Sequence, residues 1–225
     1  DDPDARILVA CGRPLPSFEL GILPPGGDTP LPERHVGEIV LRGPSIPRHH
    51  WTGGAESAPI HTLRTGDLGY VAQGRLFVID RLKDLVIVGG VNHAPSDIER
   101  VAAGVSGLRR GRMAAFAVRG DSGTEDACLV AELSPRTMRP QAAIVAEVQA
   151  LVLERMGLTL SHVRLVPAGS MPRTSSGKIG RRAVRDRFEQ GAWPPGVTTP
   201  RRLRGWLDAA ARAIAAQSAW FKEAR

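Results

Sequence analysis

A lysine in a turn rich in serine, threonine and glycine is the first feature of this sequence that could do chemistry. Lys178 lies in PRTSSGKIGRR, residues 172–182, where an arginine-rich segment follows. An ammonium group on such a turn could reach a phosphate or carboxylate oxygen and offset negative charge that develops in a transition state. The alternative is one more solvated charge in a basic protein. The spacing alone favours this alternative.

The same turn is not a phosphate loop of the G-x-x-x-x-G-K-[ST] type. Counting back from Gly177, the first glycine of that motif would stand at position 172, which is Pro172. Ile179 stands where the motif needs serine or threonine. Any phosphate contact would therefore come from Lys178 on a flexible turn and not from a glycine-rich cradle.

A carboxylate flanked by glycines is the second candidate. Asp67 lies in LRTGDLGYV, residues 63–71. A carboxylate offers two acceptor oxygens that can bind two vicinal hydroxyls, and nucleotide-binding folds use one on ribose for this reason. Taken alone, the pattern favours an ordinary aspartate in a turn.

Charged residues cluster where the composition of the chain changes. Asp80, Arg81, Lys83 and Asp84 follow a β-rich region and precede a region with helical patterns. Such a position suits a hinge, in which a few backbone dihedrals absorb a rotation. An ordinary salt-bridged linker is the alternative.

A diglycine follows this cluster. Gly89 and Gly90 would allow close approach of a backbone or a thin ligand, although a tight hairpin explains them equally. His93 could act as a base, but the pattern favours a structural histidine.

Two regions must position these residues. Residues 1–80 contain short alternating segments broken by Gly and Pro, which predict a β-rich unit, either a small barrel or a sandwich. Residues 81–190 predict a compact α+β unit of about three strands and three helices. Residues 191–225 predict an amphipathic helical tail, packed on the domain or on another subunit rather than on a membrane.

Two helices of the second region have recognisable ends. In PSDIERVAAG, Ser96 and Glu99 have the spacing of a capping box, in which each side chain bonds a backbone amide of the first turn. In QAAIVAEVQALVLERMG, Ile144 and Val148 share one helical face, and Gly157 follows the last turn. A short helix is also predicted after Lys178.

Composition and charge limit the class of protein. The chain has 225 residues, 42% of them hydrophobic, which is typical of a globular protein, and no apolar run long enough to span a bilayer. The net charge is +7, and residues 173–225 contain 12 Lys/Arg against 4 Asp/Glu. This basic end predicts an acidic partner or a solvated face. One tyrosine and five phenylalanines leave little for base stacking, so nucleic acid is disfavoured.

Two cysteines, Cys11 and Cys128, stand far apart without a metal-binding spacing. Such cysteines are expected to be free, buried thiols in a reducing compartment, so a cytoplasmic location is predicted.

Four stretches taken together resemble one family. VGEIVLRGPSIPRHHW, LRTGDLGYV, VIDRLKDLVIVGG and PRTSSGKIGRR occur in that order, and they resemble motifs of the ATP-dependent adenylate-forming enzymes. This family includes acyl-CoA synthetases, luciferases and non-ribosomal adenylation domains. The resemblance covers about residues 11–190. It implies the β-rich end of a large adenylation domain, then a small mobile α+β C-terminal domain, here with an extra C-terminal helix.

The resemblance assigns roles to the candidate residues. Asp67 resembles the family's ligand for the ribose hydroxyls, and Arg81 resembles the arginine on the ribose and phosphate side. Lys83 falls at the hinge position. Lys178 resembles the lysine that bridges the acyl carboxylate and the α-phosphate. With the ordered set in place, the catalytic interpretation of Lys178 is preferred.

The resemblance also implies substrates and partners. ATP and Mg²⁺ would be used, with the metal site outside this chain, and an N-terminal part of the adenylation domain would be needed for activity. Gly89 and Gly90 would help to line a passage for a pantetheine thiol. Fatty acyl-AMP ligases, which acylate an acyl carrier protein, are the most similar branch. An acyl-CoA synthetase and a non-catalytic module that docks a carrier protein remain alternatives.

Overall fold

The computed structural model describes residues 7–49, 51–52, 55–56, 59–120, 124–193 and 197–198. The chain forms two compact units that divide between Lys83 and Asp84. The first unit consists of strands, and the second combines strands with helices, so the predicted α+β class is confirmed. The predicted helical tail falls almost entirely outside the described residues and stays a prediction.

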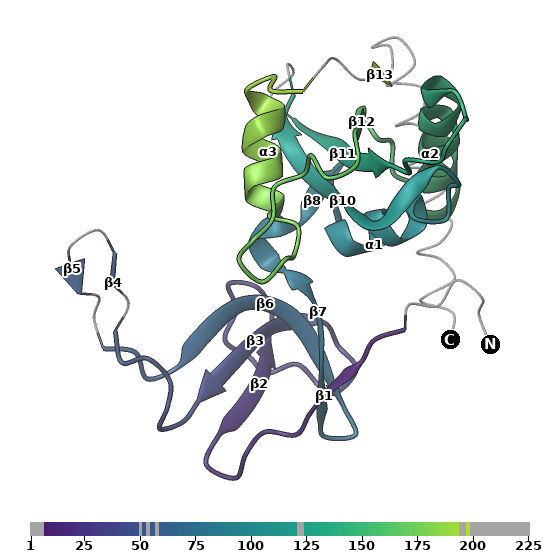
Figure 1. Ribbon diagram of the computed structural model, residues 1–225. Helices are drawn as coiled ribbons and strands as arrows, with labels where there is room; N and C mark the ends of the chain where they lie inside the picture. The colour runs from purple at the N-terminus through teal and green to yellow at the C-terminus, as the bar shows by residue number, and fades with distance from the viewer. Residues whose placement is uncertain are drawn as a thin grey trace. The chain divides into compact units, whose positions relative to one another are not determined.

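The first unit contains a five-stranded antiparallel sheet with the strand order β1-β7-β6-β3-β2 (Figure 1). Its strands are β1 (Ala10–Gly12), β2 (Glu19–Leu23), β3 (Gly37–Arg42), β6 (Leu63–Ala72) and β7 (Arg75–Arg81). A separate hairpin pairs β4 (Trp51–Thr52) with β5 (Ala55–Glu56). The predicted barrel or sandwich is wrong, because β1 and β2 stay at opposite edges of one open sheet.

The second unit contains a four-stranded sheet with the order β10-β11-β12-β13. Its strands are β10 (Leu108–Arg119), β11 (Glu125–Leu133), β12 (His162–Val166) and β13 (Val197–Thr198), and its helices are α1 (Pro95–Ala102), α2 (Gln141–Met156) and α3 (Arg181–Glu189). The neighbours β11 and β12 are parallel and are joined through α2, as a parallel pair requires a crossover.

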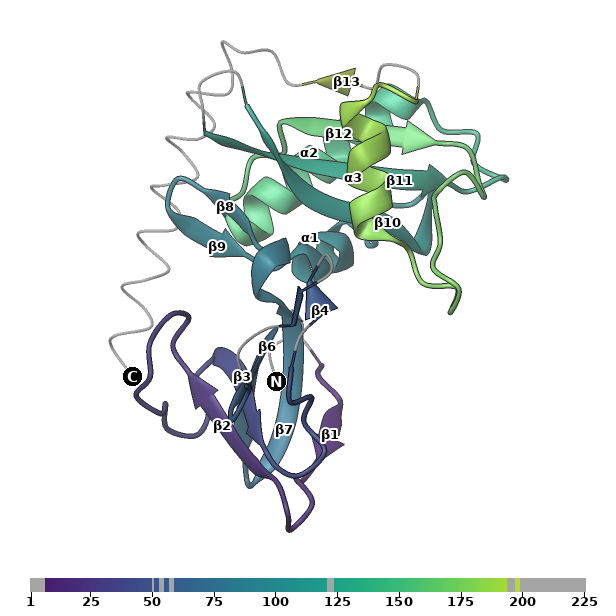
Figure 2. The same ribbon diagram turned by 90° about the vertical axis from the view of Figure 1, so that its left-hand side faces the viewer.

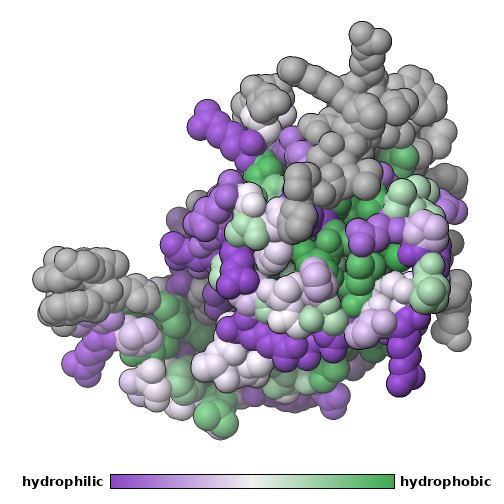
Figure 3. Space-filling view, turned by 45° about the horizontal axis from the view of Figure 1, so that its top comes forward, coloured by the Kyte–Doolittle hydropathy of each residue, from purple (hydrophilic) through white to green (hydrophobic). Residues whose placement is uncertain are grey.

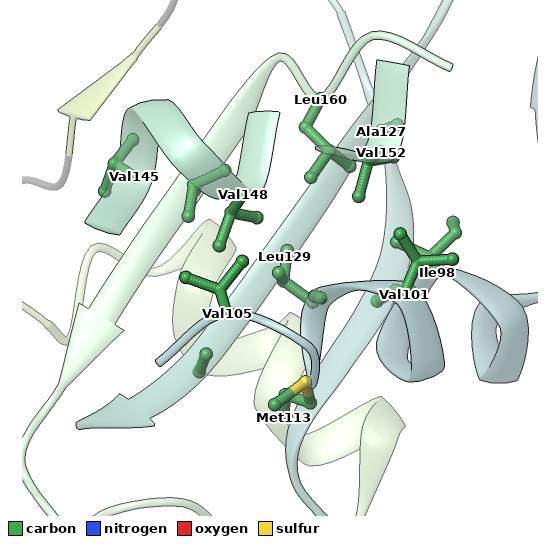
Figure 4. Packing of buried hydrophobic residues seen from close by; sticks show 14 of the residues in the cluster. Ile98, Val101, Val105, Met113, Ala127, Leu129, Val145, Val148, Val152 and Leu160 are labelled. Carbon is green, nitrogen blue, oxygen red and sulfur yellow. The ribbon is translucent and has the colours of Figure 1, made fainter. Parts of the chain in front are cut away.

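Both faces of this sheet are covered by helices. In β11, Leu129 and Ala131 belong to the cluster that includes side chains of α1 and α2, whereas Cys128 and Val130 belong to a second cluster with Val184 of α3. This division follows from the two-residue period of a strand. Figure 2 shows α2 and α3 on opposite faces of the sheet, and Figure 4 shows the larger cluster at close range.

The helix ends are partly as predicted. In α2, Ile144 and Val148 are fully buried, and Gly157 ends the helix in the left-handed conformation with φ 62°, so both predictions are confirmed. The prediction of a capping box at the start of α1 is wrong. The helix begins two residues earlier than an N-cap at Ser96 implies, with Ala94 as N-cap, no side-chain cap hydrogen bond and Pro95 as its first residue. The Glu99 carboxylate accepts from the Ala115 amide instead.

The diglycine forms the turn of a tight hairpin. It joins β8 (Val86–Val88) to β9 (Val91–His93), and Gly89 and Gly90 have φ values of 59° and 81°. Two successive residues with positive φ are what a two-residue type I′ turn requires. A Cβ atom at either glycine would meet nothing within 4 Å, so backbone conformation, not crowding, explains these glycines.

The cysteines differ in their surroundings. Both are free thiols, but Cys128 is buried whereas Cys11 is exposed, so the expectation of two buried thiols is wrong for Cys11. No helix among the described residues is long and apolar enough to cross a membrane. On the face shown in Figure 3, hydrophilic side chains (purple) border an area of hydrophobic side chains (green), a mixture that is ordinary for a folded protein.

His93, at the end of β9, is predicted to make the second unit less stable in acid. Burial lowers the pKa of His93 below its ordinary value of 6.5. The unfolded chain therefore gains this proton at a higher pH than the folded chain does. The contribution of neutral His93 to the free energy of unfolding is fully present above about pH 6.5, and it is lost as the pH drops towards the folded-state pKa.

Urea unfolding at about pH 7.5 and about pH 5.5 measures this effect. Between these two pH values, the free energy of unfolding is expected to fall by up to about 1 kcal/mol more in the wild-type chain than in His93→Gln. An equal loss in both proteins would mean that another group causes the acid sensitivity.

Candidate functional site

Asp67 lies inside the long strand β6, not in a turn, so the interpretation of LRTGDLGYV as a turn is wrong. The pairing of β3 with β6 joins Glu38 to Leu68 and Val40 to Arg64. Three residues of β6, numbers 65–67, thus lie opposite Ile39 alone. Gly66 adopts a φ of 73°, which few other residues tolerate. Asp67 therefore belongs to a bulge, a feature that redirects a side chain out of the regular ladder.

A buried carboxylate holds this bulge in place. Glu38 is only 5% exposed, and one of its oxygens accepts a bond from the Gly66 amide at 3.2 Å while the other accepts from Arg64 Nε at 3.0 Å. The hydroxyl of Thr65 donates to the Ile39 carbonyl at 2.8 Å and accepts from the Asp67 amide at 3.1 Å. The backbone that leads into Asp67 is thus fixed, which positions its side chain.

Arg81 lies directly beside Asp67. The two residues are cross-strand partners in β6 and β7, and Arg81 Nε donates to Asp67 Oδ1 at 3.1 Å. The side chains are 59% and 35% exposed. Exposed ion pairs contribute only about 0–1 kcal/mol to stability, so this pair has little structural value. Among the described residues no further donor to the Asp67 carboxylate is found, and its Oδ2 can accept a ligand hydroxyl.

Lys178 is presented by a small hairpin between β12 and α3. Arg173 and Ile179 form an isolated bridge, and the Thr174 amide donates to the Lys178 carbonyl at 2.8 Å. Gly177 closes the turn with a φ of 80°, and its amide donates a hydrogen bond to the Thr174 carbonyl at 2.9 Å. The Lys178 side chain is exposed, although its backbone is held by this ladder. The turn is therefore a hydrogen-bonded hairpin.

A cavity of about 410 Å³ opens beside this hairpin. Its lining includes Lys178 and Ile179 from the hairpin, Arg181 from α3, Glu99 and Arg100 from α1, and Met113 from β10. Its wall thus combines apolar surface with three cations and one carboxylate.

An ion-pair network stands in this wall. The Glu99 carboxylate accepts from the Ala115 amide at 2.9 Å and from Arg181 at 2.8 Å. Arg181 also reaches Asp84 at 3.4 Å. This network connects the start of α3 to α1 and β10, and sequence reasoning missed it because Glu99 had been assigned to a helix cap.

The remaining candidates have separate positions. Lys83 is exposed in the short 3-10 helix η1 (Leu82–Asp84), where the two units divide. Gly89, Gly90 and Lys178 belong to the second unit, whereas Asp67 and Arg81 belong to the first. Among the described residues no group of three His, Cys, Asp or Glu side chains could hold a metal ion. The functional roles of all six residues stay predictions.

Comparison with known proteins places this chain in a class. No model of a protein family matches. The chain is 39% identical over 160 residues to the long-chain-fatty-acid–AMP ligase FadD28 of Mycobacterium tuberculosis, which covers 68% of this chain and 25% of that protein. It is 34% identical over 200 residues to the medium-chain-fatty-acid–[acyl-carrier-protein] ligase JamA of Moorena producens, with 83% and 34% covered.

A solved structure agrees with these relatives. A structure from work on fatty acyl-adenylate ligases of E. coli and L. pneumophila matches with a TM-score of 0.65 and 30% identity, over 82% of this chain and 33% of that one. The chain is therefore related to the adenylate-forming enzymes and fits the C-terminal portion of one. Within that class its two named relatives are, by their names, a fatty-acid–AMP ligase and a fatty-acid ligase for an acyl carrier protein. It spans about a quarter to a third of the curated relatives it matches.

Proposed function

We propose that this chain is part of an ATP-dependent ligase that converts a fatty acid to an acyl-adenylate and transfers the acyl group to the phosphopantetheine thiol of an acyl carrier protein. The observation that carries the proposal is the pair formed by Asp67 and Arg81. A fixed bulge holds the carboxylate, and the arginine lies at 3.1 Å on the next strand. The arrangement suits a ligand with vicinal hydroxyls next to a phosphate.

The first half-reaction joins the fatty acid to AMP. A carboxylate oxygen of the acid attacks the α-phosphorus of ATP, the bond from that phosphorus to the bridging oxygen breaks, and pyrophosphate leaves. Asp67 accepts bonds from the ribose hydroxyls, and Arg81 lies on the phosphate side. Lys178 bridges the attacking carboxylate and the α-phosphate and offsets the charge that develops between them. Mg²⁺ would neutralise the phosphates, and its ligands are expected outside this chain.

The second half-reaction transfers the acyl group. The pantetheine thiol loses its proton and attacks the acyl carbonyl carbon, and AMP leaves with the electrons of the broken C–O bond. In the proposed mechanism the second unit rotates at Lys83, so that Lys178 leaves and the turn at Gly89 and Gly90 helps to line the thiol passage. Closure of this kind excludes water from a reactive mixed anhydride.

The charge of the chain supports a carrier protein as the acceptor. Arg182 and Arg185 are exposed on α3, one turn apart, within the basic end of the sequence. Acidic carrier proteins would be attracted to such a face, mostly through a faster association rate. JamA, by its name, is a ligase for an acyl carrier protein.

Product analysis by mass spectrometry tests the proposal. The chain, with and without an N-terminal adenylation segment, is incubated with Mg·ATP and a mid-length fatty acid, and with either a phosphopantetheinylated carrier protein or CoA. Acylated carrier protein in the complemented reaction is the expected result. Acyl-CoA instead would assign the chain to an acyl-CoA synthetase. Absence of both products, together with retained carrier binding, would favour a non-catalytic docking module.

A further inference from the structure

A second buried carboxylate lies near the Lys178 hairpin and has no part in the mechanism above. Glu132 in β11 is fully buried and accepts a bond from Arg109 at 2.6 Å and from the Met171 amide at 3.2 Å. Burial alone would raise the pKa of Glu132, but backbone bonds from Gly169 and Met171 and the charge of Arg109 outweigh burial and lower it. The carboxylate is therefore ionised at neutral pH.

The strand beside Glu132 is distorted in a way that brings Arg109 to it. In the ladder between β10 and β11, Leu108 pairs with Leu133 and Met113 pairs with Ala131. Residues 109–112 thus lie opposite Glu132 alone. A bulge of this kind re-aims side chains and is common beside functional sites.

On its other side, Glu132 holds the segment that leads to Lys178. Glu132 pairs with Val166 at the end of β12, after which the chain turns back through residues 167–170. The amides of Gly169 and Met171 then bond the Glu132 carboxylate, and Met171 itself is 3% exposed. The segment is therefore fixed immediately before the hairpin begins.

The hairpin grows directly from this fixed point. The next residue, Pro172, accepts a bond from the Gly180 amide at 3.0 Å, and the bridge between Arg173 and Ile179 follows. A buried ion pair contributes little net stability compared with apolar residues of the same size. The cost of burying the Glu132 carboxylate, whose partner Arg109 stays 34% exposed, is better explained by the path that this carboxylate imposes on residues 169–171.

We propose that Glu132 is a positioning residue that sets the place of Lys178 through Met171 and the base of the hairpin. The inference rests on the proposed role of Lys178 in adenylation. Glu132 touches no substrate in this scheme. Its loss should leave the second unit folded but allow the hairpin to shift, because the amides of Gly169 and Met171 lose a charged acceptor.

Amide hydrogen exchange on the 225-residue chain tests the structural half of this inference. In Glu132→Gln, the amides of Thr174 and Gly180 should exchange about tenfold faster or more relative to those of α2, as expected when a bond to a charged group is lost. Glu154→Gln makes the same change at an exposed position of α2 and should alter nothing. Val148→Ala, in the core on the other face, should accelerate exchange in hairpin and helix alike.

Half-reaction rates, measured in the adenylating enzyme that contains this chain, test the functional half. Glu132→Gln should lower acyl-adenylate formation about ten- to hundredfold, the usual cost of a misplaced catalytic group. It should change thioester formation from supplied acyl-adenylate far less. Equal losses in both half-reactions, or hairpin amides that exchange in step with α2, would overturn the inference.

Lys178→Ala in the same assays distinguishes a failure of the proposed role of Lys178 from a failure of the positioning role of Glu132. If it lowers both half-reactions equally, the proposed role of Lys178 is wrong, and Glu132 is then only an anchor of the fold. If it lowers adenylation alone while Glu132→Gln lowers neither half-reaction, the role of Lys178 stands and the positioning role of Glu132 is wrong.

Discussion

Lys178→Ala is expected to lower the rate of acyl-adenylate formation by about 10²–10³-fold in the proposed ligase. The ammonium group is proposed to act where negative charge develops between the fatty acid carboxylate and the α-phosphate. Alanine removes that charge without altering the backbone ladder of residues 173–179, whose bonds involve main-chain atoms of Thr174 and Lys178. Thioester formation from supplied acyl-adenylate should change much less, because Lys178 is proposed to have left by then.

The matched control for this prediction is Arg136→Ala. Arg136 is an exposed cation of the second unit in the loop before α2, so its removal changes the net charge by the same amount. It should leave both half-reactions close to wild type. Comparable losses in the two half-reactions of Lys178→Ala would show that the proposed role of the lysine in adenylation alone is wrong.

Asp67→Ala is expected to raise the KM for ATP about ten- to hundredfold, since bonds to a charged group are each worth about 1.5–3 kcal/mol. The carboxylate is proposed to accept both ribose hydroxyls, while its contact with Arg81 orients the arginine. Asp67→Asn keeps the shape and one acceptor oxygen, so its KM should fall between those of wild type and alanine. Steady-state kinetics with ATP as the varied substrate measure all three.

Glu19→Gln serves as the control for Asp67. Glu19 is an exposed carboxylate of the same unit, on β2, at 3.8 Å from Arg42. Its removal should leave the KM for ATP unchanged. If Asp67→Ala also leaves that KM unchanged, the pair with Arg81 does not bind the nucleotide, and the β6 bulge needs another explanation.

Much of the fold could be predicted from local patterns. The helix α2 was recognisable because its apolar residues repeat at helical spacing and Gly157 supplies the left-handed residue that ends it. The separation into a β-rich and an α+β region follows from a change of periodicity near residue 81. These signals are local, so no knowledge of distant partners is needed to read them.

The site could be predicted only in part, because its geometry depends on residues far away in the sequence. Asp67 was found, but its bulge depends on Glu38 in another strand. Glu99 was assigned to a cap because its spacing from Ser96 is that of a capping box, whereas tertiary partners on β10 and α3 hold it. Local spacing cannot reveal such competition between a helix end and a distant arginine.

The start of β10 shows the same limitation. The strand begins at Leu108, but RRGR at residues 109–112 interrupts the alternation of apolar residues that would reveal this start in the sequence. Those residues form the bulge opposite Glu132, so their polarity reflects one buried partner and not a loop.

That bulge also affects how sequences of this kind can diverge. The four residues 109–112 lie opposite a single residue of β11, so β10 has three extra residues here. In a regular strand, residues five positions apart would face opposite sides of the sheet. Because of the extra residues, Leu108 and Met113 face the same core. Removing or adding a single residue there would reverse the inward and outward faces of everything that follows in the strand. Insertions and deletions should therefore be selected against at this point even though it contains the exposed Arg110, and aligned relatives should differ there by substitution rather than by length.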